Sequence, residues 1–382
     1  MNKFENITNG IEKTGFILEF EICKILEKHH WIVINNRYYI DDLKNIEREI
    51  DIIAYRTKSK EDTAFYTVLI ISCKKAESNM WAFLTKNYNE NDPNINFYPI
   101  INWTNVDVLK YMLTKMTPSV LKKIINKNNN IKSLYKLDKQ VFAFQEMDKT
   151  NGMPKNDKNI YNSIVTTIKA LEYERRSLNK RKKTKAFYNF NLISIIDGEM
   201  VDINFDSSKL VTREIDNIKY LNRHIINNIE EFYRVHFIKK DKFESILDKY
   251  NSLVDWNFLG YYNLLKHYYV DVFNYKERVK VLWKEFTEEI LFWVNLNTKV
   301  AYEEITGKNF DTKVKSVDYE YDNKVKILNI IIILADSSTF VDDDINNELN
   351  KDNHLMKIIK EKLLKWYRYK GKFRFSEPTI PF

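Results

Sequence analysis

Hydrophobic and polar positions follow regular periods along the N-terminal part of the chain. Residues 11–28 carry apolar side chains at helical spacing, which predicts an amphipathic helix. Residues 30–40, 50–56 and 65–74 are rich in β-branched and aromatic side chains, which predicts three strands. The polar segment 57–63 separates the last two strands, so we expect these two to form a hairpin.

The periods change further along the chain. A second long helix is predicted over residues 159–183, and a strand over residues 191–196. The dipeptide Asp197-Gly198 is a turn signal, which predicts a return strand over residues 200–205. The apolar stripe of the second helix consists of Ile160, Ile164, Ile168 and Leu171. A helix, three strands, a helix and a strand in this order predict an α/β fold.

Two regions fall outside this pattern. Residues 82–150 are mixed, and we interpret them as a helical insertion into an N-terminal domain of residues 1–255. Residues 256–382 are predicted to form a mainly helical accessory domain, rich in aromatic side chains that are more typical of a packed core than of a base-stacking surface. A β-prone run at residues 314–334 interrupts its helices.

Composition narrows the classes of function. The 382 residues are 44% hydrophobic, which is enough for a buried core, and include only 7 glycines. The sequence has no glycine-rich phosphate loop, so an ATPase or a dinucleotide enzyme is not expected. The net charge of +8 permits a nucleic-acid partner without requiring one. Two cysteines give neither a disulfide framework nor a four-ligand zinc site, and the longest apolar run is too short for a membrane span, so we expect a cytoplasmic protein without a membrane partner.

The first predicted helix places a carboxylate in an unfavourable position. Helical spacing puts Glu19 in the middle of the apolar face, while Glu21 points toward solvent. A buried carboxylate is costly unless it is paired, hydrogen-bonded or bound to a metal. Glu19 therefore belongs either to a structural ion pair, for which Arg48 is a candidate, or to a metal site.

The predicted hairpin brings a second acid close to a lysine. Strand alternation is expected to point Asp51 away from the face of Ile50 and Ile52. If the turn centres near Asp62, Asp51 lies opposite about Cys73 and therefore beside Lys74. We expect the strand to end at Lys74, at an open edge of the sheet. Taken singly, the acid could be an ordinary solvent-facing residue, and the lysine could mark a strand that leaves the core. Together with Glu19 they predict a Mg²⁺ site with a lysine that orients the nucleophile or offsets charge.

At this point the sequence resembles a known group of proteins. The segment GFILE (Gly15 to Glu19), the segment REIDIIA from Arg48, and a strand ending in SCK and followed by Trp81 resemble the PD-(D/E)XK restriction-endonuclease-like superfamily, in particular its Mrr-like and related branches. The resemblance covers residues 10–85 and 157–205. It implies a restriction-endonuclease-like core of the order αβββαβ.

The resemblance also implies roles for individual residues. Asp51 corresponds to the metal-binding aspartate, Lys74 to the catalytic lysine and Glu19 to the helix glutamate, while the Cys73 backbone carbonyl would be a further ligand. The implied cofactor is Mg²⁺, for which Mn²⁺ can substitute. Ser72 departs from the family pattern, because a carboxylate or an amide is usual at that position. Either Glu19 compensates for the missing charge, or the site is weak or inactive.

The second predicted helix ends in a basic run that could contact nucleic-acid phosphates, with Phe187, Tyr188 and Phe190 close by for stacking. A solvated helix end explains the same run equally well. The run consists of Arg175, Arg176, Arg181, Lys182 and Lys183.

The function predicted from these features is metal-dependent hydrolysis of phosphodiester bonds, in DNA. The resemblance implies bacterial restriction or antiviral defence as the context, with a homo-oligomer or a larger defence complex as the assembly. The first alternative is a nuclease-fold subunit that has lost catalysis and binds nucleic acid or scaffolds a complex. The second is a protein-interaction module whose basic charge is incidental.

Overall fold

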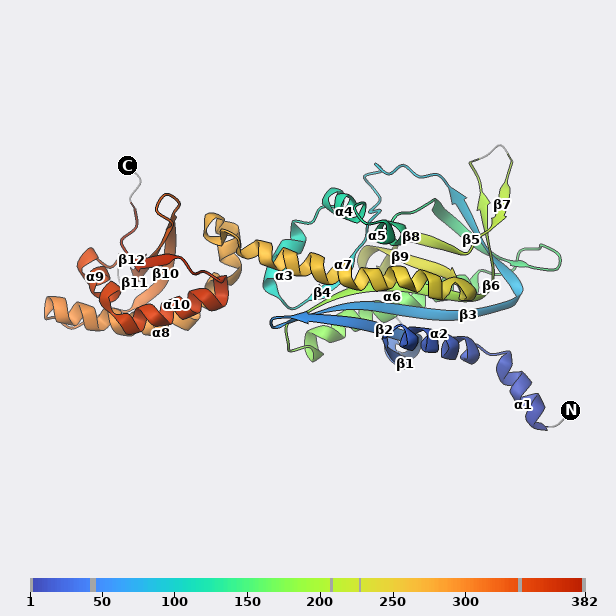
Figure 1. Cartoon of the computed structure of the whole chain (residues 1–382), viewed down its shortest axis with the longest axis horizontal. Coiled ribbons are helices and arrows are strands. Elements are labelled where there is room, and N and C mark those ends of the chain that lie inside the picture. The colour runs from blue at the N-terminus through green and yellow to red at the C-terminus, as the bar shows by residue number, and fades with distance from the viewer. Residues whose placement is uncertain (1–2, 42–45, 207–208, 227, 336–338, 380–382) are drawn as a thin grey trace. The chain divides into compact units, whose positions relative to one another are not determined.

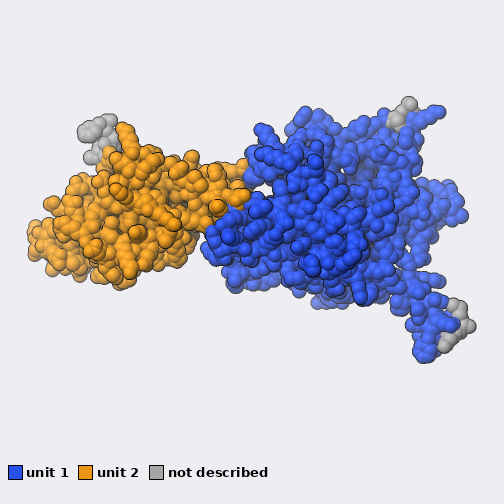
Figure 2. Space-filling view, in the orientation of Figure 1, with its two compact units in different colours: residues 1–106, 116–262 blue, residues 107–115, 263–382 orange. Residues whose placement is uncertain are grey.

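The computed structural model describes residues 3–41, 46–206, 209–226, 228–335 and 339–379. The chain divides into two compact units, which Figure 2 shows in different colours. Unit 1 comprises Met1–Val106 and Met116–Tyr262, and unit 2 comprises Asp107–Lys115 and Asn263–Phe382. Every residue predicted to form the site or to bind nucleic acid lies in unit 1.

Unit 1 is built on one mixed sheet, to which nine strands of the described residues contribute (Figure 1). The main path runs β1-β2-β3-β6-β9-β8, with β4 and β7 paired to β6 and β5 paired to β3. The pairs β3–β6 and β6–β9 are parallel, whereas β1–β2, β2–β3 and β8–β9 are antiparallel. The strands are β1 (Ile32–Asp41), β2 (Ile46–Lys60), β3 (Thr63–Lys86), β4 (Ile101–Thr104), β5 (Gln140–Asp148), β6 (Ala186–Asn204), β7 (Val211–Glu214), β8 (Asn217–Ile226) and β9 (Ile229–Lys239).

Helices cover both faces of this sheet. On one face, α2 (Phe16–Lys28) and the first part of α7 (Phe243–Tyr269) share a core cluster with strand residues such as Ile52 and Ile71. On the other face, α6 (Lys158–Arg181) packs its apolar stripe, which is fully buried as the sequence predicted. The remaining helices of unit 1 are α1 (Lys3–Glu12), α4 (Pro118–Ile125), α5 (Asn129–Tyr135) and the short η1 (Lys240–Lys242).

The predicted hairpin is present as β2 and β3. Its turn is tight, because Lys60 pairs with Thr63 and Glu61 takes a positive φ of 54°. The ladder between the two strands ends at the pair Ile52–Ile71. Continued by one step, this register places Asp51 opposite Ser72, one residue away from the predicted position.

Two strand boundaries were predicted wrongly. β3 does not end at Lys74 but continues to Lys86, and β6 runs without reversal through Asp197-Gly198. The two strands stay paired in parallel, and the register shift between Lys75 and Met80 absorbs extra residues of β3. Gly198 permits this, because a Cβ there would lie 2.8 Å from the backbone oxygen of Ala76. The glycine therefore allows close approach of two strands rather than a turn.

The predicted insertion is only partly helical. It contains α4 and α5, but its strands β4 and β5 pair with β6 and β3 and so extend the sheet of unit 1. Another of its helices, α3 (Asp107–Thr114), belongs to unit 2.

Unit 2 combines helices with a three-stranded sheet of the order β10-β11-β12. The β-prone run 314–334 forms the antiparallel pair β10 and β11, and Lys326 between them has a positive φ of 58°. The buried Tyr367 ring packs against both Phe273 and Trp283, so these aromatic side chains contribute to the core. The elements are η2 (Val272–Asn274), α8 (Lys276–Thr306), β10 (Val314–Asp322), β11 (Ile327–Leu334), α9 (Asp343–Lys351), α10 (Asn353–Tyr367) and β12 (Lys372–Phe375). Across the described residues of both units, no helix is long and apolar enough to cross a membrane.

Candidate active site at the divergence of two strands

The Asp51 carboxylate lies where β2 separates from β3. Its Oδ2 accepts a hydrogen bond from the Cys73 backbone N–H at 2.6 Å and one from the Ser72 hydroxyl at 3.2 Å. The Lys74 ammonium donates to the same oxygen at 3.4 Å. Because the β2–β3 ladder stops at Ile52, the carboxylate replaces the backbone acceptor that Cys73 would otherwise find on β2.

The strand is irregular at this point. Ile50 packs in the core cluster beneath α6, whereas Ile52 packs in the cluster beneath α2. The expectation that both isoleucines share one face is therefore wrong. Asn36, which the β1–β2 register places opposite Asp51, has a positive φ of 53°. The regular pleat is interrupted on both strands, and the Asp51 side chain is directed along the sheet toward β3.

Glu19 belongs to the same electrostatic environment. It lies in the first turn of α2 and is half-buried. Burial raises the pKa of Glu19 to about 7, and the negative charge of Asp51 adds to the increase while Lys74 opposes it. A carboxylate with this pKa changes its protonation state near neutral pH, which is a property expected of a group that exchanges protons or binds a cation.

Helix α2 differs from the sequence prediction in three respects. By helical spacing, Phe16 and Phe20 belong to the apolar face around Glu19, yet each is 62% exposed, so the apolar face of α2 is narrower than predicted. Arg48, the candidate partner of Glu19, instead pairs with Asp41 at 3.1 Å. Glu21, predicted to point to solvent, is only partly exposed and pairs with Lys240 at 2.5 Å.

One acid near this site, Glu49, was not predicted from the sequence. Glu49 is exposed, lies two residues before Asp51 on β2, and its charge contributes to the raised pKa of Glu19. Its position inside the REIDIIA segment is the signal that could have drawn attention to it. Glu49 thus adds a third negative charge to the surroundings of Asp51 and Glu19.

The oxygen atoms around Asp51 suit a weakly held cation such as Mg²⁺ better than a metal ion that the protein encloses completely. Within the described residues, no hydrogen bond reaches Oδ1 of Asp51, which leaves that oxygen to a ligand. Burial raises the pKa of the Cys73 thiol well above its usual range, so a thiolate ligand is not expected and only the Cys73 carbonyl remains a candidate. In the described part of the chain, no three His, Cys, Asp or Glu side chains converge as a ready-made metal site. Mg²⁺ tolerates such a set, because it keeps several water ligands.

The structure places the end of the basic run near the first residues of β3, whereas Lys74 lies in the middle of that strand. Lys182 donates to the Tyr66 hydroxyl at 3.0 Å, and Tyr66 precedes Lys74 by eight strand residues, which is about 25 Å. Arg175 pairs with Glu172 and Glu231. Arg181 pairs with the buried Glu174.

The remaining members of that run, Arg176 and Lys183, are exposed. The neighbouring aromatic side chains are less accessible than expected. Phe187 and Phe190 are buried, and the Tyr188 ring stacks on Tyr66 at 4.2 Å. Base stacking by the two phenylalanines is therefore ruled out in this conformation.

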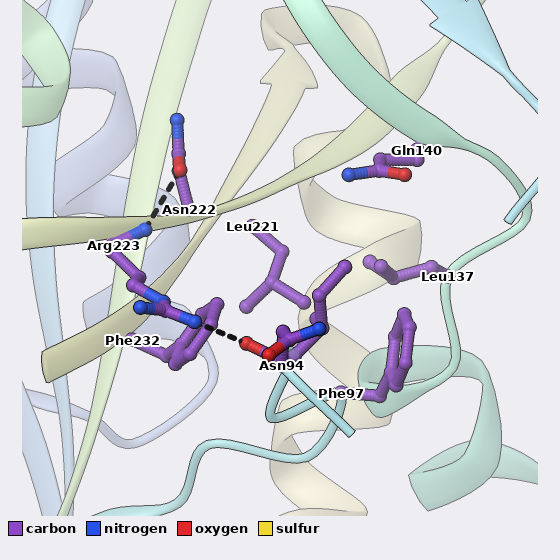
Figure 3. A pocket seen from close by; sticks show the side chains of 9 residues that line it. Asn94, Phe97, Leu137, Gln140, Leu221, Asn222, Arg223 and Phe232 are labelled. Carbon is purple, nitrogen blue, oxygen red and sulfur yellow. Dashed lines mark hydrogen bonds between the residues drawn. The ribbon is translucent and has the colours of Figure 1, made fainter. Parts of the chain in front are cut away.

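A separate hollow of about 170 Å³ contains none of these groups (Figure 3). Phe97 and Phe232 contribute to its apolar wall. Arg223 also lines the hollow. Its guanidinium donates to the backbone carbonyl of Asn94 and lies 4.9 Å from the centre of the Phe232 ring. Among the described residues that line the hollow, none is acidic.

Comparison of the chain with protein-family models, curated proteins and solved structures gave no match.

Proposed function

We propose that this chain is a metal-dependent nuclease that hydrolyses phosphodiester bonds in DNA, with a core of the PD-(D/E)XK kind. The observation that carries the proposal is the meeting of Asp51 and Lys74 at the divergence of β2 and β3, with Glu19 close enough for its pKa to respond to both. The order α2, β1, β2, β3, α6, β6, with β3 parallel to β6, supports the same assignment.

Each side chain has a role that follows from its position. Asp51 and Glu19 would hold the cation, which when bound supplies Lewis-acid stabilisation and lowers the pKa of a water molecule. Lys74 is 28% exposed and held by Asp51, so its ammonium is positioned yet accessible to a phosphate oxygen, where it would offset developing charge. The pKa of Glu19 is about 7 without a cation, so cation binding would release the proton that Glu19 holds below that pH.

Ser72 favours a second candidate function. The side chain is fully buried and its hydroxyl donates to Asp51, so it supplies no charge to a cation. A subunit that keeps the fold but has lost catalysis, and that binds nucleic acid or scaffolds a complex, would tolerate such a replacement. The context of restriction or antiviral defence, and an oligomeric or larger assembly, stay predictions from the resemblance.

A nuclease assay separates the two candidates. Plasmid, linear duplex and single-stranded DNA are incubated with Mg²⁺ or Mn²⁺ and with wild type, Lys74→Ala or Glu19→Gln. Matched controls are Lys75→Ala, next to the catalytic lysine, and Glu27→Gln, an exposed acid on the same helix. We expect cleavage by wild type and both controls only. Equal activity of wild type, Lys74→Ala and Glu19→Gln would refute the assignment of this site, and an inert wild type that binds DNA would favour the second candidate.

A further inference from the structure

A pocket of about 530 Å³ lies beside Lys74, between the N-terminal half of α6 and the neighbouring ends of β1 and β2. Lys74 is part of its wall, together with Arg48 from β2 and Lys169 from α6. The pocket therefore adjoins the proposed reacting groups but is formed mostly by residues that the proposed chemistry does not use.

A buried acid organises the cations of this pocket. Asp41 is 3% exposed, and its two oxygens accept from the Lys169 ammonium at 2.8 and 2.9 Å. Arg48 binds Asp41 through Nε at 3.1 Å, and its side chain is 43% exposed. This bond leaves the terminal nitrogens of Arg48 available to an anion. Asp41 thus holds both cations in place at the wall of the pocket.

The charge of the wall favours a phosphate. Among the described residues that line the pocket, Arg48, Lys74 and Lys169 are cationic and Asp41 is acidic. The first turn of α6 does not add to this attraction, because the buried Glu146 already accepts the Asn159 backbone N–H at 3.0 Å. The attraction comes from side chains, and arginine in particular presents a planar fork that matches phosphate oxygens.

The size and the remaining wall favour one nucleotide rather than a duplex. A volume of this order is typical of pockets for a single small ligand. Tyr161 lines the pocket and is 52% exposed, so its ring can stack on a base, and the Asn162 amide offers a donor and an acceptor nearby.

We propose that this pocket binds one unpaired nucleotide of the substrate strand, with its phosphate on Arg48 and its base against Tyr161. The inference rests on the proposed function, because Lys74 connects the pocket with Asp51. It specifies the substrate class: single strands, frayed ends or overhangs are bound in preference to intact duplex.

The test is a binding measurement that needs no cleavage. Fluorescence anisotropy with an internally labelled single-stranded 12-mer is recorded in EDTA for wild type, Arg48→Gln and Tyr161→Ala. Lys180→Gln, which removes an exposed cation from the same helix outside the pocket, is the matched control. Unlabelled single-stranded DNA and covalently closed relaxed plasmid serve as competitors at equal nucleotide concentration.

We expect Tyr161→Ala to weaken binding about fivefold or more, the lower end for the loss of one stacked base. Arg48→Gln should reduce the slope of log affinity against log salt by about 0.7, the value for one phosphate contact on a single strand. Lys180→Gln should retain wild-type affinity within about twofold. The plasmid should compete much less well than the single strand.

Two results would overturn the inference: wild-type affinity in both pocket variants, or competition by closed plasmid as strong as by single strands. Both substitutions remove partly exposed side chains, and circular dichroism confirms that each variant is folded. If the binding pattern holds but no variant or wild type cleaves DNA with Mg²⁺, the pocket assignment stands and the nuclease assignment fails. If cleavage depends on Lys74 while the pocket variants bind normally, the nuclease assignment stands and the pocket assignment fails.

Discussion

Basic side chains gather in two regions of unit 1, one at the C-terminal part of α6 and one around Lys74, and the two regions differ in what these side chains contact. In the first region, Arg175 and Arg181 are bonded to acids of the same unit. In the second region, Lys74 shares the Asp51 carboxylate with a backbone N–H and a hydroxyl. Two arginines of the basic run are thus committed to carboxylates of the fold, whereas the Lys74 ammonium shares its acid with two other donors.

The cause lies in the carboxylates of α6. Glu172 and Glu174 are both buried, and a buried carboxylate requires a partner. Arg175 and Arg181 supply those partners one turn or two turns further along the helix. A count of cations in the sequence cannot reveal this, because it does not show which acids are buried.

The largest expected effect comes from a substitution beside Lys74. Asp51→Asn keeps the shape and can still accept the Cys73 N–H, but it removes the charge that would hold a cation. We expect cleavage to fall on the order of 10³-fold, as for loss of a main electrostatic group in an active site. Single-turnover rates with Mg²⁺ measure this, and Asp255→Asn, an exposed acid of α7, is a control that should stay active. Undiminished cleavage by Asp51→Asn would move the reaction elsewhere.

The next largest effect concerns the basic run at the C-terminal part of α6. Arg181→Gln leaves Glu174 with Arg37 as its remaining ion-pair partner, at 3.1 Å, so we expect a loss of about 1–2 kcal/mol in the free energy of unfolding. Urea denaturation measures this. Lys183→Gln, at an exposed neighbouring position, should change stability by less than about 0.5 kcal/mol. If Arg181→Gln is as stable as wild type but binds DNA more weakly, the basic run serves recognition after all.

A smaller effect follows from Glu19 and pH. Burial raises its pKa from 4.5 to about 7, so between these values the folded protein retains a proton that the unfolded chain releases. The contribution of this group to stability therefore decreases as the pH rises from 4.5 to 7. Without divalent cations, Tm should fall between pH 5 and pH 8, and it should fall less in Glu19→Gln. Added Mg²⁺ should raise Tm at pH 8 in wild type more than in the variant; an identical response of both would remove Glu19 from the cation site.

The smallest effect concerns Ser72. Ser72→Ala removes one hydrogen bond to Asp51, while the Cys73 N–H and Lys74 still hold the carboxylate. A neutral hydrogen bond contributes about 1 kcal/mol, so we expect a rate loss of about fivefold or less. Cleavage rates of Ser72→Ala and Asp51→Asn, measured side by side, provide the comparison. A loss as large as that of Asp51→Asn would mean that the hydroxyl contacts the cation or the substrate directly.

Local patterns predicted much of unit 1 because they depend on neighbouring residues. The apolar stripe of α6 and the polar turn of the β2–β3 hairpin both formed, and the register around Asp51 was off by one residue. The failures occurred where partners distant in sequence decide. Asp197-Gly198 is a turn signal by itself, but pairing with β3 keeps β6 extended through it. Residues 217–239 carried no prediction, yet β8 and β9 complete the sheet.

The sequence by itself determined the amphipathic helices and the β2–β3 hairpin. It also determined that Asp51 and Lys74 lie near each other on the two strands of this hairpin, since hydrophobic period and turn length are local properties. Only the tertiary structure decided that β2 and β3 part at Asp51, that Glu19 has a pKa near 7, and that Arg48 pairs with Asp41 beside a pocket. These features depend on burial and on distances between residues from different elements. Such distances are set when helices and strands pack, and no spacing along the chain encodes them directly.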